Sequence, residues 1–232
     1  MARHDEVFVK VGRVPQAADV SLLLDVSGSM AEPSRKRLQA WRLAAALGWL
    51  SLAHGDRVRL VPFADSPRDE WGPASGGRRG ASLLAHLERV APADDARSRA
   101  GPAIGRLDAR SATGGLLVLI SDLWLEDDLE LALARVPPPR WEVLVLHVLG
   151  ATEMEPRLDG RVTLRDRESG REVSVVVDEA LRGRYRRSLH ARMERIRALV
   201  AARGAVYALV PASWSLEQAV IPYLQRRALL AR

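Results

Sequence analysis

The chain contains no cysteine and few aromatic residues. Its 232 residues include six Trp, three Tyr and two Phe, so a hydrophobic core must consist mainly of Leu, Val and Ala side chains. Without cysteine, disulfides, thiolate zinc sites and cysteine nucleophiles are excluded, and a reducing compartment is favoured. The first residues, MARHDEVFVK, lack the apolar core of a signal peptide. We therefore expect a cytoplasmic protein.

Long apolar runs and lysine are also scarce. No stretch approaches the ~20 apolar residues that a membrane helix requires, so no membrane segment is predicted. Of 35 basic residues only Lys10 and Lys36 are lysine, which leaves 33 arginines. The net charge of +6 is compatible with binding to nucleic acid or to an acidic partner. Because the charge is spread along the chain, the arginine-rich codon usage of a GC-rich genome is the simpler explanation.

Strand and helix patterns alternate along the chain. Strands are predicted at 20–24, 57–63, near Trp71, and at 116–120, 141–149 and 205–210. Helices are predicted at 35–53, 82–90, 102–107, 127–135, 179–203 and 216–230. This alternation predicts a doubly wound α/β fold, in which a mostly parallel sheet is flanked by helices on both faces. We expect one domain over residues 1–232, with residues 1–18 as an N-terminal arm or edge strand.

A hairpin and a long helix are expected in the C-terminal third. Segments 161–166 and 172–177 alternate around Glu168-Ser169-Gly170, which predicts a β-hairpin insertion near 161–177. Gly204 is placed to cap the helix predicted at 179–203. The helix carries one apolar stripe, made of Leu181, Tyr185, Leu189, Met193, Ile196 and Val200.

Two of the predicted buried strands end in aspartate, Asp25 and Asp122. In open parallel sheets, ligands bind outside the carboxyl ends of the strands, where the strand order reverses. Ser27 and Ser29 follow Asp25 in a loop that Gly28 opens, and alternate side chains of an extended loop point the same way. Oxygen donors alone suit a hard cation such as Mg²⁺ or Mn²⁺ better than Zn²⁺. The alternative is a serine-rich N-cap turn that holds no metal.

The segment Leu23–Met30, LLDVSGSM, resembles the metal-ion-dependent adhesion site of von Willebrand factor A domains. In that family the metal is held by an Asp-x-Ser-x-Ser loop, a Thr from a second loop and an Asp from a third. Ser98 falls where the Thr is expected, although the residues around it depart from the usual Gly-Thr-Asp-Leu pattern. The resemblance implies a metal site made of Asp25, Ser27, Ser29, Ser98 and Asp122.

Longer stretches resemble the bacterial domain-of-unknown-function family numbered 58. They are Trp41–Phe63, His147–Leu149 with Glu155 and Pro156, Asp166–Gly170, and the helix around Tyr185. The usual N-terminal Gly-Asp-x-x-Arg-x-Ile-Asp-Trp stretch is absent, so a short or truncated member is expected. Members are commonly encoded beside MoxR-type AAA+ ATPases. The resemblance thus implies a metal-dependent docking partner of such an ATPase, with a partner carboxylate completing the coordination of the ion.

Catalysis is not expected. No Gly-x-Ser-x-Gly elbow and no phosphate-binding glycine loop is present. A phosphatase with Asp25 as nucleophile would need an acid at the position of Ser27. His147 lies in an apolar strand, which favours a satisfied core residue over a base. The other histidines, also without metal-ligand spacing, are His4, His54, His86 and His190.

The expected function is therefore a non-enzymatic, metal-dependent protein-interaction module. The alternative is a nucleic-acid-binding accessory protein that uses a basic helix over residues 182–197. Seven arginines could form that surface or simply a solvated helix face: Arg182, Arg184, Arg186, Arg187, Arg192, Arg195 and Arg197.

Overall fold

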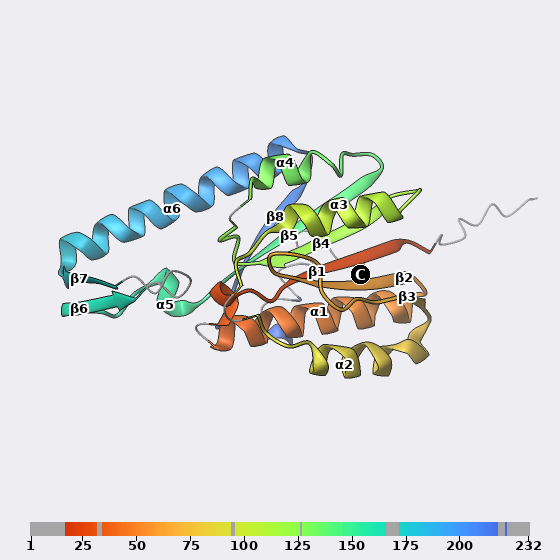
Figure 1. The fold of residues 1–232 in the computed structure, drawn as a ribbon, viewed down its shortest axis with the longest axis horizontal. Coiled ribbons are helices and arrows are strands. Elements are labelled where there is room, and N and C mark those ends of the chain that lie inside the picture. The colour runs from red at the N-terminus through yellow and green to blue at the C-terminus, as the bar shows by residue number, and fades with distance from the viewer. Residues whose placement is uncertain are drawn as a thin grey trace, which may run out of the picture.

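A six-stranded sheet forms the centre of the molecule (Figure 1). The computed structural model describes residues 17–31, 34–93, 96–125, 127–165, 172–217 and 221. The strand order is β3-β2-β1-β4-β5-β8, and all neighbours are parallel except β3, which runs antiparallel to β2. The strands are β1 (Asp19–Asp25), β2 (Arg57–Phe63), β3 (Trp71–Ser75), β4 (Gly115–Ser121), β5 (Trp141–Leu149) and β8 (Val206–Pro211). The predicted mostly parallel sheet is confirmed.

Helices cover both faces of this sheet, as predicted (Figure 1). One layer consists of α1 (Ser34–His54) and α2 (Gly80–Arg89). The other consists of α3 (Ala100–Arg110), α4 (Leu129–Leu133) and α6 (Glu179–Ala202). Short elements connect them: η1 (Gly28–Ala31), η2 (Gly77–Arg79) and α5 (Ala151–Met154). The predicted hairpin forms a separate two-stranded antiparallel sheet from β6 (Gly160–Arg165) and β7 (Glu172–Val177).

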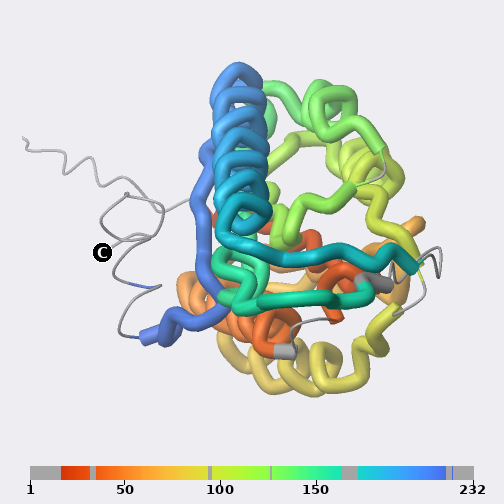
Figure 2. The backbone as a smooth tube through the Cα atoms, turned by 90° about the vertical axis from the view of Figure 1, so that its left-hand side faces the viewer, coloured from red at the N-terminus to blue at the C-terminus, as the bar shows by residue number. Residues whose placement is uncertain are grey.

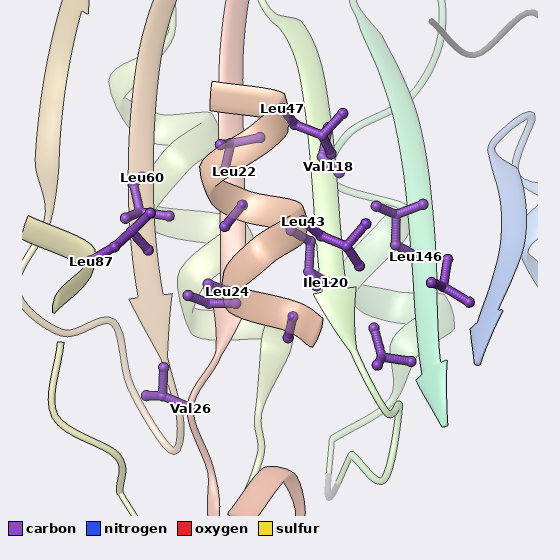
Figure 3. Packing of buried hydrophobic residues seen from close by; sticks show 14 of the residues in the cluster. Leu22, Leu24, Val26, Leu43, Leu47, Leu60, Leu87, Val118, Ile120 and Leu146 are labelled. Carbon is purple, nitrogen blue, oxygen red and sulfur yellow. The ribbon is translucent and has the colours of Figure 1, made fainter. Parts of the chain in front are cut away.

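The central strands are buried on both faces, which explains their continuous apolar sequences. Alternate residues of a strand point to opposite faces. Leu22 and Leu24 of β1 pack with Leu43 and Leu47 of α1 (Figure 3), whereas Leu23 belongs to the cluster on the other face. Aliphatic side chains dominate both clusters, as the composition predicts.

The predicted and observed elements differ mainly at their ends. β2 and β5 have the predicted bounds. α3 begins before Pro102, since a missing N–H in the first turn costs no helical hydrogen bond, and it ends at Arg110 instead of at residue 107. α4 begins later than predicted because Asp128 caps it, accepting hydrogen bonds from two backbone N–H groups. Residues 1–16 of the predicted arm, the hairpin turn Glu168–Gly170 and most of the helix predicted at 216–230 lie outside the described residues.

α6 runs past the end of the sheet where β1 and β4 terminate (Figures 1 and 2). Val200, in its C-terminal half, packs into the core on the α3 side. The N-terminal half lies beside α5 and the hairpin instead. The apolar stripe predicted for this helix is therefore buried only in part: Leu189 is 7% exposed, but Tyr185 is 37% exposed. Gly204 follows the helix with φ of +70°, in the left-handed conformation expected of a cap.

Candidate metal centre

The two predicted aspartates meet at the point where the strand order reverses. From β1 the chain crosses through α1 to β2 on one side, whereas β4 lies on the other side of β1. Leu24 pairs with Ile120, so β1 and β4 end at the same level. Asp25 is the last residue of β1 and Asp122 directly follows β4. Both aspartates are fully buried.

The loop after β1 links these two aspartates through Ser27 and Ser29. The backbone N–H of Ser27 donates to Asp25 Oδ1 at 3.0 Å, which folds the loop back over the strand end. The Oγ atoms of Ser27 and Ser29 lie 3.2 Å apart. Ser29 Oγ in turn donates to Asp122 Oδ1 at 3.2 Å. The four residues therefore form one connected cluster.

A second loop and the end of β4 add two more hydroxyls. Ser98 Oγ and Ser121 Oγ each donate to Asp25 Oδ2 at 2.6 Å. Both serines are buried. The structure thus brings all five predicted site residues together, Ser98 included. Ser121 was not predicted as a site residue, although it directly precedes Asp122 in the sequence.

Two charged residues of this cluster were not predicted. Lys36, in the first turn of α1, donates from Nζ to Asp122 Oδ2 at 2.8 Å and to Glu153 Oε1 at 2.6 Å. Its side chain is 1% exposed. Glu153 belongs to α5, and its Oε2 accepts from the N–H of Gly150 at 2.6 Å. For Lys36 the sequence offered one signal, the scarcity of lysine in this chain. For Glu153 it offered none, because α5 is too short to leave a periodic pattern in the sequence.

α6 holds the loop that follows Asp122. Leu123 has φ of +57°, a conformation that bulky side chains rarely adopt. Its carbonyl oxygen accepts from Arg192 Nη2 at 2.6 Å, and the guanidinium lies 4.0 Å from the ring centroid of Trp124. The N–H of Trp124 donates to Asp122 Oδ1 at 3.2 Å. Trp124 is 43% exposed, so an accessible indole lies next to the buried aspartates.

The electrostatics of the cluster favour a cation. Burial raises the pKa of Asp25 to about 6, and the charge of Asp122 adds to the rise. Hydrogen bonds from Ser121, Ser27 and Ser98 partly offset this rise in pKa. Burial also raises the pKa of Glu153, and Lys36 opposes that shift. A positive ion near Asp25 would relieve the cost of keeping its carboxylate ionised.

His147 of β5 lies near the cluster and is satisfied within the core. Its Nδ1 is 2.7 Å from Tyr207 Oη, and the residue is 1% exposed. Burial lowers the pKa of its imidazole to about 4, so it is neutral at pH 7. This placement agrees with the core role predicted from the sequence.

The donor set suits a hard divalent cation. Serine hydroxyls and aspartate carboxylates supply only oxygen, which Mg²⁺ and Mn²⁺ prefer, and such ions keep several water ligands. Over the described residues, no group of three or more His, Cys, Asp or Glu side chains is placed to hold an ion. An ion here would therefore depend on the hydroxyls as well as on the two carboxylates. The residues that would hold it are Asp25, Ser27, Ser29, Ser98 and Asp122.

The arginines of α6 do not form one continuous free surface. Arg182 and Arg186 both form ion pairs with Glu179. Arg192 is engaged with the loop after Asp122. Arg197 forms an ion pair with Glu194, so four of the seven arginines have partners within the chain, which weakens the case for a nucleic-acid surface.

A doubly wound sheet with serine and aspartate oxygens at its switch point defines a von Willebrand factor A-like domain. Within that class, the chain belongs to the family described as protein of unknown function DUF58, whose model matches residues 1–195. No curated protein matches the chain. Across the described residues, no helix combines the length and apolar character needed to cross a membrane.

Solved structures share this fold. The conserved hypothetical protein BatB from Bacteroides thetaiotaomicron matches with a TM-score of 0.56 and 20% identity, over 92% of this chain and 100% of that chain. An aerotolerance-related membrane protein from Bacteroides fragilis, carrying multiple mutations to serines, matches with a TM-score of 0.55 and 21% identity, over 90% and 100%. Proximal thread matrix protein 1 from the mussel byssus, with a zinc-occupied MIDAS motif, is a weaker match, with a TM-score of 0.45 and 12% identity over 57% and 38%.

Proposed function

We propose that this chain is a metal-dependent protein-interaction module. A divalent cation, Mg²⁺ or Mn²⁺, binds at the switch point and accepts a carboxylate from a partner protein. The observation that carries the proposal is the cluster in which Ser27 and Ser29 connect two fully buried aspartates. Burying two carboxylates together is costly unless cations compensate both, and among the described residues Lys36 forms an ion pair with Asp122 whereas Asp25 accepts hydrogen bonds only from neutral serine groups. The proposed ligands are Asp25, Ser27, Ser29, Ser98 and Asp122.

The proposal assigns the ion a docking role and no catalytic one. The hydroxyls of Ser98 and Ser121 are buried and both donate to Asp25, so neither serine is presented to a substrate. The imidazole of His147 is bonded to Tyr207 and has a lowered pKa, so it does not activate either serine. An ion with open positions can still bind a carboxylate from outside.

The surroundings of the site support a protein as the partner. Trp124 offers an exposed indole at its rim, and aromatic residues of this kind are enriched at protein interfaces. A glutamate or aspartate of the partner would bind the ion, while neighbouring apolar groups could cover the indole. Following the family resemblance, we take this partner to be a MoxR-type AAA+ ATPase and place the complex in the cytoplasm.

The test measures binding of the purified chain to a MoxR-type ATPase from the same organism by biolayer interferometry. We expect binding in MgCl₂ to weaken at least about tenfold in EDTA, and equally in Asp25→Ala, because the bridging ion is lost. Asp65→Ala removes an exposed carboxylate of the same charge and should bind like the unmodified chain. Binding that is equal in MgCl₂, in EDTA and in Asp25→Ala would refute the proposal.

A further inference from the structure

Lys36 places a positive charge inside the proposed metal centre. Its Nζ lies 2.8 Å from Asp122 Oδ2 and 2.6 Å from Glu153 Oε1, and its side chain is almost fully buried. Together with Asp25, the cluster contains three carboxylates and one ammonium group. The chain itself therefore supplies a cation to a site that we propose binds a second one.

The ammonium and the proposed ion share one carboxylate. Oδ2 of Asp122 faces Lys36, whereas Oδ1 accepts hydrogen bonds from the hydroxyl of Ser29 and the N–H of Trp124. Ser29 is a proposed metal ligand, so Oδ1 is the oxygen on the metal side. An ion bound there would compete with Lys36 for the charge of Asp122, and the two cations would repel each other.

The position of Lys36 in its helix is electrostatically unfavourable, so its contacts with Asp122 and Glu153 must compensate for it. A cation in the first turn of a helix is opposed by the helix dipole. Its neighbours Arg35 and Arg37 are more exposed, so Lys36 lies on the buried side of the first turn of α1. The compact ammonium of Lys36 has three donors and bonds to both carboxylates at once. Apart from Lys10, every other basic residue among the 35 lysines and arginines is an arginine.

We propose that Lys36 is a resident counter-ion that sets the metal affinity of the site. It neutralises Asp122 when no ion is bound, so the fold does not depend on metal. It also opposes the ion when it binds, so tight binding requires the extra negative charge of a partner carboxylate. The inference rests on the proposed function, because it presumes the metal site, and it makes metal and partner bind cooperatively.

The experiment is a calorimetric titration of the whole chain with MnCl₂. Lys36→Met removes the charge and keeps a side chain of similar length. We expect it to tighten Mn²⁺ binding about tenfold or more, since a like charge a few ångströms away is removed. Arg42→Met removes an exposed cation of the same helix and should change the affinity less than about twofold. In EDTA, Lys36→Met should also unfold at a lower temperature than the unmodified chain, and Mn²⁺ should raise that temperature more.

A second variant decides the question if Lys36→Met does not fold even with Mn²⁺. Glu153→Gln removes one of the two carboxylates that pair with Lys36, so the ammonium is paired with Asp122 alone. Because one nearby negative charge is lost, Mn²⁺ binding should weaken several-fold. Equal or weaker binding by folded Lys36→Met, or unchanged or tighter binding by Glu153→Gln, overturns the role of Lys36.

The outcomes also separate this inference from the proposed function. If Mn²⁺ binding is lost in Asp25→Ala but unchanged in Lys36→Met, the metal site stands and the role of Lys36 is refuted. If only Lys36→Met binds Mn²⁺, the role of Lys36 is supported, and metal-dependent docking by the unmodified chain is then decided by its binding to the partner in MgCl₂ and in EDTA. If neither binds Mn²⁺, both proposals fail.

Discussion

The buried carboxylate of Asp25 is expected to destabilise the metal-free fold. Burial and the charge of Asp122 raise its pKa from 3.8 to about 6. At 1.36 kcal/mol per pKa unit, a rise of about 2 units means that the ionised group costs the native state ~3 kcal/mol at pH 7. Asparagine keeps the shape but accepts fewer hydrogen bonds, a loss of about 1–2 kcal/mol. Asp25→Asn should therefore stabilise the chain in EDTA by about 1–2 kcal/mol.

Urea unfolding in EDTA tests this prediction across pH. Because the pKa of Asp25 is higher in the folded state, the cost is full above pH 6, shrinks as the pH falls through 6 and vanishes below about 3.8. The advantage of Asp25→Asn should thus decline from pH 7 to pH 4.5. In MgCl₂ the order should reverse, because only the unmodified chain gains from the ion. Asp65→Asn, an exposed control, should stay within about 0.5 kcal/mol at each pH.

Two results would contradict this reasoning. One is an Asp25→Asn variant that is less stable than the unmodified chain at pH 7 in EDTA. The other is a stability difference that grows as the pH falls. Either would mean that the hydrogen bonds to Asp25 outweigh the cost of burying its charge.

Burial lowers the pKa of His147 to about 4, so the native state loses stability relative to the unfolded chain as the pH falls from 6.5 towards 4. In His147→Gln the new side chain can still bond to Tyr207 but does not titrate. As the pH falls from 7 to 4, its free energy of unfolding in urea should rise by up to about 3 kcal/mol relative to that of the unmodified chain. A difference that stays constant over this range would exclude the effect. A Cβ on Gly114, which has φ of +80°, would overlap the carbonyl oxygen of Arg140. Gly114→Ala should therefore lower the free energy of unfolding by more than about 2 kcal/mol, whereas Gly55→Ala, with open space around it, should cost about 1 kcal/mol; equal losses would argue against the overlap.

The parts of the site that were predictable are those that lie next to a strand in sequence. β1 is apolar because it is buried on both faces, and the loop with Ser27 and Ser29 continues directly from it. Asp122 follows a second such strand. Ser98 was located through its spacing in the family pattern, and the structure places it 2.6 Å from Asp25 despite its divergent surroundings.

The rest depends on contacts between distant parts of the chain. Lys36 and Glu153 are 117 residues apart, and their contact requires the short helix α5 to fold back beside the start of α1. A four-residue helix leaves no periodic signal that could predict this. Similarly, the period of α6 shows which side is apolar but not where the sheet beneath it ends, so the exposure of Tyr185 was not foreseen.

Because Lys36 is buried, the chemical reactivity of its amine depends on how often the centre opens. It is the one lysine within the described residues, and its amine is enclosed by the carboxylates of Asp122 and Glu153. A small acylating reagent can modify that amine only when these groups separate. The extent of labelling at a single position, read by peptide mass spectrometry, therefore measures how often the centre opens, without any engineered probe.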